Sequence, residues 1–221
     1  MEFNQQFVSC HTGMFNQKKG IAMKVLVIGA TGAVGNAVVT ELATRHTVIA
    51  ASRSSATHSV DFTQPASVEA LFQTVGKVDA IVATVGDVHF GPLSEMSSEQ
   101  FRVGLNSKLM GQVELVLVGQ KYVNDGGSIT LTSGIVGAQP IRYGASAAAV
   151  NRAVEGFVVG AAIELPRGIR INVVSPTVLQ ESMPAFGPYF VGFEPAPAAR
   201  VALAYARSVD GLQTGQIYTV W

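Results

Sequence analysis

Three glycines at intervals of three residues are the first feature of the sequence that could carry chemistry. Gly29, Gly32 and Gly35 lie in the stretch GATGAVG, which directly follows the short apolar run Val25–Ile28. In a unit of strand, glycine turn and helix, such glycines permit a sharp turn, a close approach to a pyrophosphate and tight helix packing. The free N–H groups and the dipole at the start of the helix attract the anion. The stretch therefore predicts nucleotide binding.

A second group of polar residues follows the next predicted strand, Thr47–Ala51. Ser52, Arg53 and Ser54 come directly after it, at the position that faces the adenosine ribose in a fold of this type. An acidic residue there binds the 2′-hydroxyl of NAD, whereas an arginine favours the 2′-phosphate of NADP. The stretch has an arginine and no carboxylate, which predicts NADP(H) in preference to NAD(H). The alternative is that Arg53 is an ordinary exposed loop charge.

Asp61 has two interpretations. It lies in a predicted short strand over residues 60–62, at whose end its side chain could meet the adenine amino group. Alternatively, it is a turn or cap residue, because Pro65 begins a helix soon after it. The residues alone leave both interpretations open.

The elements that must position these residues alternate along the chain. After the first strand and helix, strands are predicted at 47–51, 60–62, 78–85, 126–132, 169–174 and 216–220, and helices at 67–75, 99–122, 143–165 and 196–208. Regular alternation predicts a single-domain α/β fold of the Rossmann type, with one doubly wound parallel sheet of about seven strands and helices on both faces. This domain takes in residues 23–221, and residues 1–22 are expected to be a flexible, dispensable N-terminal extension.

The composition excludes several classes of function. The 221 residues carry 15 Lys and Arg against 15 Asp and Glu, so a net charge of zero gives no electrostatic basis for binding nucleic acid or an anionic membrane. No apolar run approaches the roughly 18 to 20 residues that span a bilayer. The four histidines lack metal-ligand spacing, which predicts no metal site. The single cysteine, Cys10, and the lack of a signal peptide favour a reducing, cytoplasmic location.

With these elements in place, residues 23–221 resemble the short-chain dehydrogenase/reductase family. The resemblance rests on motifs in the family's order: GATGAVG, ATVG at 83–86, LTSG at 131–134, YGASAAAV from 143, IRINVVSPT and TGQIYTVW. It implies hydride transfer between a nicotinamide and a small carbonyl or alcohol substrate. Together with the glycine turn and the arginine, it gives these expected cofactor contacts: Gly29, Thr31, Gly32, Ala33, Val34, Gly35, Ser52, Arg53, Ser54, Asp61, Phe62, Thr84, Val85, Gly86, Pro176, Thr177 and Val178.

The family's catalytic residues are present only in part. Ser133 matches the family serine, which holds the substrate oxygen, and Tyr143 matches the tyrosine that donates the proton. The family lysine four residues later lowers the tyrosine pKa, and here that position is Ala147. Lys108 stands where the family has an asparagine on the preceding helix, and Asn106 is out of register by two residues. The predicted catalytic residues are Ser133, Tyr143 and Lys108.

Two roles are open for Lys108, besides that of a surface or interface charge. Its ammonium could support Tyr143 in place of the absent lysine, or it could bind an anionic group of the substrate. Replacement of Lys108 by methionine tests both roles.

Three functions are compatible with these residues. The first is an NADP(H)-dependent oxidoreductase, the second a catalytically impaired NADP-binding sensor or scaffold, and the third an epimerase or dehydratase of the same fold. The alanine-rich segment 143–165 and the apolar face of the helix from Phe101 suit the interface of a homodimer or homotetramer. The expected partners are a small-molecule substrate and further copies of the chain.

Overall fold

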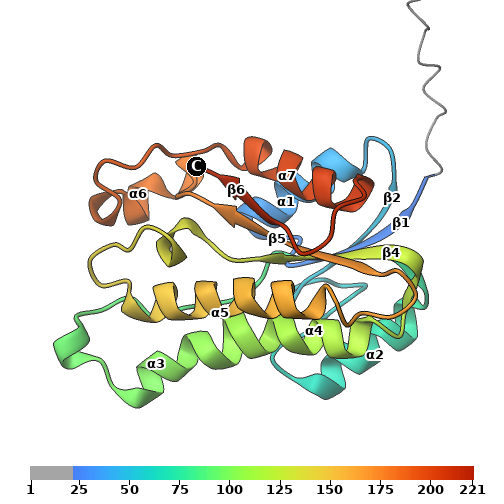
Figure 1. Ribbon diagram of the computed structural model, residues 1–221, viewed down its shortest axis with the longest axis horizontal. Helices are drawn as coiled ribbons and strands as arrows, with labels where there is room; N and C mark the ends of the chain where they lie inside the picture. The colour runs from blue at the N-terminus through green and yellow to red at the C-terminus, as the bar shows by residue number, and fades with distance from the viewer. Residues whose placement is uncertain (1–21) are drawn as a thin grey trace, which may run out of the picture.

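Six parallel strands form the centre of the protein, whose computed structural model describes residues 22–221 (Figure 1). The strands are β1 (Lys24–Ile28), β2 (Thr47–Ala51), β3 (Val78–Ala83), β4 (Val123–Thr132), β5 (Arg170–Pro176) and β6 (Ile217–Val220). They lie side by side in the order β2-β1-β3-β4-β5-β6. The chain therefore changes its direction of winding between β1 and β3, and such a switch point creates a crevice outside the carboxyl ends of the strands.

Helices cover both faces of this sheet. On one face, α1 (Ala33–Leu42) packs against α7 (Ala198–Asp210), and the other face carries α2 (Pro65–Val75), α4 (Gly111–Gly119) and α5 (Ala145–Ala161). The shorter segments are η1 (Leu93–Glu95), α3 (Ser98–Gly104), the π-helical η2 (Leu105–Met110), η3 (Ile135–Gly137), η4 (Gln180–Ser182), α6 (Met183–Phe186) and η5 (Gly187–Tyr189). This is the single-domain α/β architecture with a parallel sheet that the alternating pattern predicts.

The first strand shows why the sheet is covered on both faces. Val25, Leu26, Val27 and Ile28 are all 0% exposed. Leu26 and Ile28 join the apolar cluster under α2, α4 and α5, whereas Val25 and Val27 join the cluster under α1 and α7. Successive side chains of a strand point to opposite faces, so a run of four apolar residues contributes to both layers of the core.

The sheet has six strands rather than about seven, because residues 60–62 do not form a strand. Residues 52–64 form a loop that meets the sheet edge only through an isolated bridge between Ser52 and Ser59. Within this loop Asp61 accepts hydrogen bonds from the Oγ1 and the backbone N–H of Thr63, at 2.7 and 3.0 Å. These bonds lower the pKa of the Asp61 carboxyl. The structure contains the turn at Asp61 and no strand there, and a contact of Asp61 with an adenine stays a prediction.

Two long helices also differ from their predicted ranges. The helix predicted at 99–122 runs from Ser98 to Gly119 through the π-helical segment η2, in which the backbone hydrogen bonds span one additional residue. The helix predicted at 143–165 is α5, which covers only Ala145–Ala161. Tyr143 has a φ of 67°, and this backbone conformation cannot continue a right-handed helix. Tyr143 therefore precedes the helix on which the prediction placed it.

Two predictions concern residues 1–22, of which the structure describes only the last. They are the flexible extension at residues 1–22 and the reducing location inferred from Cys10, and both stay predictions. Between residues 22 and 221, no helix combines the length and the hydropathy needed to cross a bilayer.

Candidate functional site

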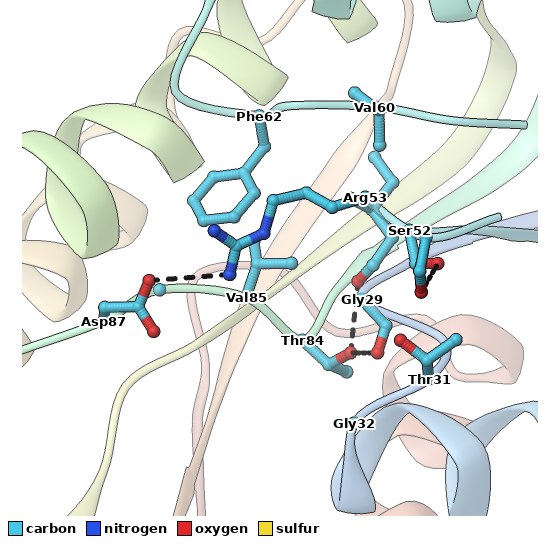
Figure 2. A pocket seen from close by; sticks show the side chains of 13 residues that line it. Gly29, Thr31, Gly32, Ser52, Arg53, Val60, Phe62, Thr84, Val85 and Asp87 are labelled. Atoms are coloured by element: carbon cyan, nitrogen blue, oxygen red, sulfur yellow. Dashed lines mark hydrogen bonds and ion pairs between the residues drawn. The ribbon is translucent and has the colours of Figure 1, made fainter.

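A pocket of about 480 Å³ lies at the carboxyl ends of β1, β2 and β3, where the winding of the sheet reverses (Figure 2). Three segments form its walls, one after each of these strands, and the segment after β2 is the loop 52–64. The lining residues are Ile28, Gly29, Thr31, Gly32, Ser52, Arg53, Ser54, Val60, Phe62, Thr84, Val85, Gly86 and Asp87. Ligands of open α/β sheets bind at this kind of position.

Most of the predicted cofactor contacts line this pocket, and the exceptions have local explanations. The predicted residues outside the lining are Ala33, Val34, Gly35, Asp61, Pro176, Thr177 and Val178. The first three belong to the first turn of α1, and Asp61 is held in its turn with Thr63. Pro176 is the last residue of β5, two strands away from β3, and residues 177 and 178 follow it. Ile28, Val60 and Asp87 also line the pocket but were not among the predicted cofactor contacts, although the sequence places Asp87 in the loop over the expected cofactor, directly after the ATVG motif.

The glycine turn is packed tightly against the end of β3. A Cβ atom added to Gly35 would lie 2.0 Å from the carbonyl oxygen of Gly29, and one added to Gly29 would lie 2.7 Å from that of Thr84. Gly29 also has a φ of 90°. At Gly32 an added Cβ would meet only the Gly29 oxygen, at 3.5 Å, and no side chain caps the start of α1 there. The N–H groups of the first turn are therefore open to an anion.

Arg53 and Asp87 face each other across the opening of the pocket (Figure 2). Arg53 Nη2 lies 3.9 Å from Asp87 Oδ2, and the two side chains are 69% and 66% exposed. The backbone N–H of Asp87 donates a hydrogen bond to Ser107 Oγ at 2.9 Å, which ties Asp87 to the π-helical segment η2. Of the 13 residues that line the pocket, Arg53 is the only cation and Asp87 the only anion.

A second group of polar contacts lies behind the pocket wall. Lys108 packs against Gly86, where an added Cβ would lie 2.7 Å from Lys108 Cα. Lys108 Nζ donates to the carbonyl oxygen of Ser133 at 3.0 Å. The Ser133 hydroxyl donates to Glu155 Oε1 at 2.9 Å, and Arg152 Nη1 donates to Glu155 Oε2 at 2.9 Å. The predicted serine and lysine therefore meet at the end of β4.

The surroundings of Lys108 change its acidity. Burial lowers the pKa of Lys108 to about 8, while the negative charges of Asp87 and Glu155 act in the opposite direction. A lysine with a pKa in this range can gain and lose a proton near neutral pH, which is what general acid–base chemistry requires. Lys108 lies in η2, and π-helical segments are frequent at functional sites. Asn106, in the same segment, is exposed.

The structure leaves Tyr143 apart from this group. Its ring stands edge-on to that of Tyr189, with a centroid distance of 6.1 Å, and the Arg142 guanidinium lies 4.8 Å from its centre. The three side chains belong to a separate shallow hollow beside η5. Throughout residues 22–221, no hydrogen bond joins the Tyr143 hydroxyl to Ser133 or Lys108. The geometry thus unites two of the three predicted catalytic residues.

Instead, residues of α5 lie near the end of β4. Ala147, Asn151 and Glu155 follow each other at intervals of four residues, and all three are buried. Ala147 is 2% exposed and lies in an apolar cluster with Val178. Asn151 Oδ1 has no hydrogen-bond partner among the described residues. The sequence reasoning missed Asn151 and Glu155, although their spacing shows that they share one face of the helix.

Comparisons with known proteins agree with this geometry. The sequence profile of a family described as Enoyl-(Acyl carrier protein) reductase matches residues 19–210. The chain belongs to the short-chain dehydrogenase/reductase family. A small-chain dehydrogenase whose crystal structure contains NADPH is 25% identical to it, with a TM-score of 0.80 over 90% of this chain and 97% of that chain.

Two further relatives of this short-chain dehydrogenase/reductase are similar over different lengths. The protein lin1944 from Listeria innocua is 51% identical, and its crystal structure superposes with a TM-score of 0.89 over 90% of this chain and 100% of that chain. An uncharacterized oxidoreductase of Methylorubrum extorquens is 33% identical over 114 residues. That match takes in 49% of this chain and 44% of the relative, so it spans less than half the length of either protein.

The pocket fits the nicotinamide dinucleotide that members of this oxidoreductase family use. The cradle formed by Gly29 and Gly35 would be filled by any Cβ atom, and the uncapped start of α1 offers free N–H groups to a pyrophosphate. Val60 and Phe62 supply apolar walls for a planar base, next to the polar residues that follow β2. The lining therefore has the chemistry of an adenosine diphosphate site.

Proposed function

We propose that this short-chain dehydrogenase/reductase binds NADP(H) in preference to NAD(H) and transfers a hydride between the nicotinamide and a small carbonyl or alcohol. The observation that carries the proposal is Arg53, the only cation of the pocket lining, with Ser52 and Ser54 beside it and no carboxylate at the end of β2. A guanidinium pairs with a phosphate through parallel hydrogen bonds, so it favours a 2′-phosphate over a 2′-hydroxyl. A relative with bound NADPH supports the same cofactor.

In this proposal the remaining cofactor contacts follow the carboxyl edge of the sheet. Thr31, Gly32 and the first turn of α1 hold the pyrophosphate, while Thr84–Gly86 line the path from the adenosine toward β5. Residues 176–178 are the proposed nicotinamide contacts, and the buried Thr177 Oγ1 has no partner within residues 22–221. When bound, the nicotinamide supplies or accepts the hydride.

Reduction of a carbonyl also requires a proton at its oxygen. Ser133 does not supply it while its hydroxyl donates to Glu155. We assign this role to Lys108, whose ammonium gives up a proton at a pKa of about 8 and whose neutral amine takes one back in alcohol oxidation. Tyr143 is not part of the proposed proton path, because it lies in the separate hollow with Tyr189.

Titration calorimetry with NADPH and NADH tests the cofactor half of the proposal. The Arg53→Gln variant should bind NADPH about tenfold more weakly or worse, because a hydrogen bond to a charged group contributes about 1.5–3 kcal/mol, and its affinity for NADH should stay the same. Arg102→Gln, at an exposed arginine on α3, is the matched control. Folded protein that binds neither dinucleotide would refute the proposed function.

Turnover of a panel of carbonyls and alcohols tests the catalytic half. Lys108→Met should keep NADPH binding and lose turnover.

A second candidate function, that of an NADP(H)-binding sensor, is favoured by Ala147, which is buried among apolar side chains where the family has its lysine. Tight NADPH binding without turnover of any compound, in the parent protein and in Lys108→Met alike, would support the sensor.

We also propose that the protein forms a homodimer or homotetramer through the helices on one face of the sheet. Val103, Met110 and Leu117 recur every seven residues along the helix from α3 to α4, and they are 42%, 48% and 48% exposed. A hollow between α4 and α5 is lined by Leu117 and Phe157. Exposed apolar side chains aligned along one helix are typical of an interface.

A further inference from the structure

The ion pair at the mouth of the pocket has a consequence for the choice of nucleotide. We propose that Asp87 is a specificity-determining residue, which weakens the preference for 2′-phosphorylated nucleotides because it competes with the phosphate for Arg53. The inference rests on the proposed function, since it requires that a 2′-phosphate bind to this arginine.

The two members of the pair differ in how firmly they are held. The backbone N–H of Asp87 is bonded to Ser107 Oγ at 2.9 Å, and Ser107 itself is only 8% exposed. The preceding residue, Gly86, has a φ of 125° and packs against the backbone of Lys108. Asp87 is thus anchored to η2, whereas Arg53 reaches it with a long side chain across the open pocket (Figure 2).

A 2′-phosphate would change the charges around Arg53. It carries a charge of about −1.5 to −2 at neutral pH, and a guanidinium that binds it with good geometry must leave or share its carboxylate partner. In the structure that partner is 3.9 Å away and anchored, so the phosphate also meets the like charge of Asp87. A 2′-hydroxyl has no charge and leaves the pair intact. Asp87 therefore weakens binding of NADP(H) and leaves that of NAD(H) unchanged.

The adenosine halves of the two cofactors allow a test that does not depend on turnover. In calorimetry, Asp87→Asn should bind 2′,5′-ADP and NADPH about two- to fivefold more tightly than the parent, the range expected when an exposed ion pair is removed. Its affinities for 5′-ADP and NADH should be unchanged. Asp125→Asn is the matched control, because Asp125 is exposed, pairs with Arg167 and lies at the opposite end of the sheet.

A double-mutant cycle separates competition from a general effect of charge. If Asp87 acts by competing for the arginine, then Asp87→Asn tightens 2′,5′-ADP binding less in an Arg53→Gln background than in the parent. Equal tightening in both backgrounds, equal tightening for 5′-ADP, or no tightening at all would overturn the inference and leave the proposed function standing. If the parent protein binds neither NADPH nor 2′,5′-ADP, the proposed function and this inference both fail.

Discussion

The hydroxyl of Ser133 can donate one hydrogen bond, and in this protein the acceptor is the carboxylate of Glu155. Both residues are buried, at 2% and 4% exposure, so solvent does not replace the bond if it is lost. The Ser133 oxygen then presents only lone pairs to any other group. The hydroxyl proton of Ser133 is thus engaged in an internal hydrogen bond, and the role of Ser133 toward a substrate oxygen stays a prediction.

This arrangement makes a prediction about stability. Ser133→Ala should lower the free energy of unfolding by about 1–3 kcal/mol, because it leaves a buried carboxylate oxygen without its donor. Ser128→Ala is the control, since Ser128 lies in β4, which ends directly before Ser133, and its buried hydroxyl has no partner among the described residues. Urea unfolding curves measure both. Equal losses in the two variants would show that the bond to Glu155 does not stabilise the folded state.

Lys108 makes a prediction about pH. Burial lowers its pKa from 10.5 to about 8 in the folded protein, so between these values the unfolded chain holds the proton more strongly than the folded one. Stability rises with pH wherever the unfolded state binds more protons. Relative to Lys108→Met, the parent should therefore gain about 1–3 kcal/mol of unfolding free energy between pH 7.5 and 10.

The measurement for Lys108 is a series of urea unfolding curves across this pH range. Lys121→Met, at an exposed lysine after α4, serves as the control and should follow the parent at every pH. If the difference between the parent and Lys108→Met does not depend on pH, then Lys108 is not desolvated in the folded protein.

At the scale of elements, the turn between β1 and α1 separates the roles of its glycines. Gly35→Ala should destabilise the protein by about 1–3 kcal/mol or prevent folding, because its Cβ would lie 2.0 Å from the Gly29 carbonyl oxygen. Gly32→Ala should fold with near-parental stability, since its Cβ meets only an ordinary contact at 3.5 Å. Thermal unfolding measures this difference.

The same pair of variants also reports on the ligand. Gly32→Ala should lose NADPH affinity, because a side chain at the uncapped start of α1 blocks the approach of a pyrophosphate. Its stability provides the control for folding, and Gly35→Ala provides the contrast. Gly32→Ala protein that binds NADPH as tightly as the parent would place the phosphates elsewhere.

The sequence predicts some helices, strands and turns more accurately than others. The strand, glycine turn and helix from Lys24 to Leu42 were predictable because an apolar run and a glycine spacing are local signals. The loop 52–64, the π-helical segment η2 and the positive φ of Tyr143 depend on contacts with distant residues, and no local periodicity reports them. The predicted helix start at Tyr143 was wrong for this reason. The letters YGAS are typical of a helix start, but the helix begins two residues later, at Ala145.

At the scale of the whole molecule, the exposed apolar residues of α3 and α4 predict self-association. Leu117→Glu should convert the assembled protein to a smaller species, because a carboxylate cannot be buried in an interface without a partner. Leu212→Glu is the control, since Leu212 is 93% exposed and follows α7. Sedimentation velocity measures both, and circular dichroism checks folding. A monomeric parent, or a Leu117→Glu variant that assembles normally, contradicts the prediction.

Family, fold class and most of the residues that line the pocket were predictable because their motifs are short and lie at strand ends. The reaction end was predicted in part. Of the three predicted catalytic residues, Lys108 and Ser133 lie together and Tyr143 lies apart, whereas Glu155, which was not predicted, reaches Ser133 through the packing of α5 against β4. Local composition does not indicate that a charged residue such as Glu155 is buried by contacts with distant parts of the chain.

The loop 52–64, which forms the pocket wall beyond β2, is held at the edge of the sheet by few backbone hydrogen bonds. Ser52 accepts a hydrogen bond from the N–H of Val60 and donates one to the carbonyl oxygen of His58, both at 3.2 Å, where a seventh strand would have formed a full ladder. Insertions, deletions and exchanges in this short span can therefore accumulate without disturbing the sheet beside it. With the cofactor site proposed above, coenzyme choice can evolve, or be engineered, as a trait separate from the stability of the scaffold.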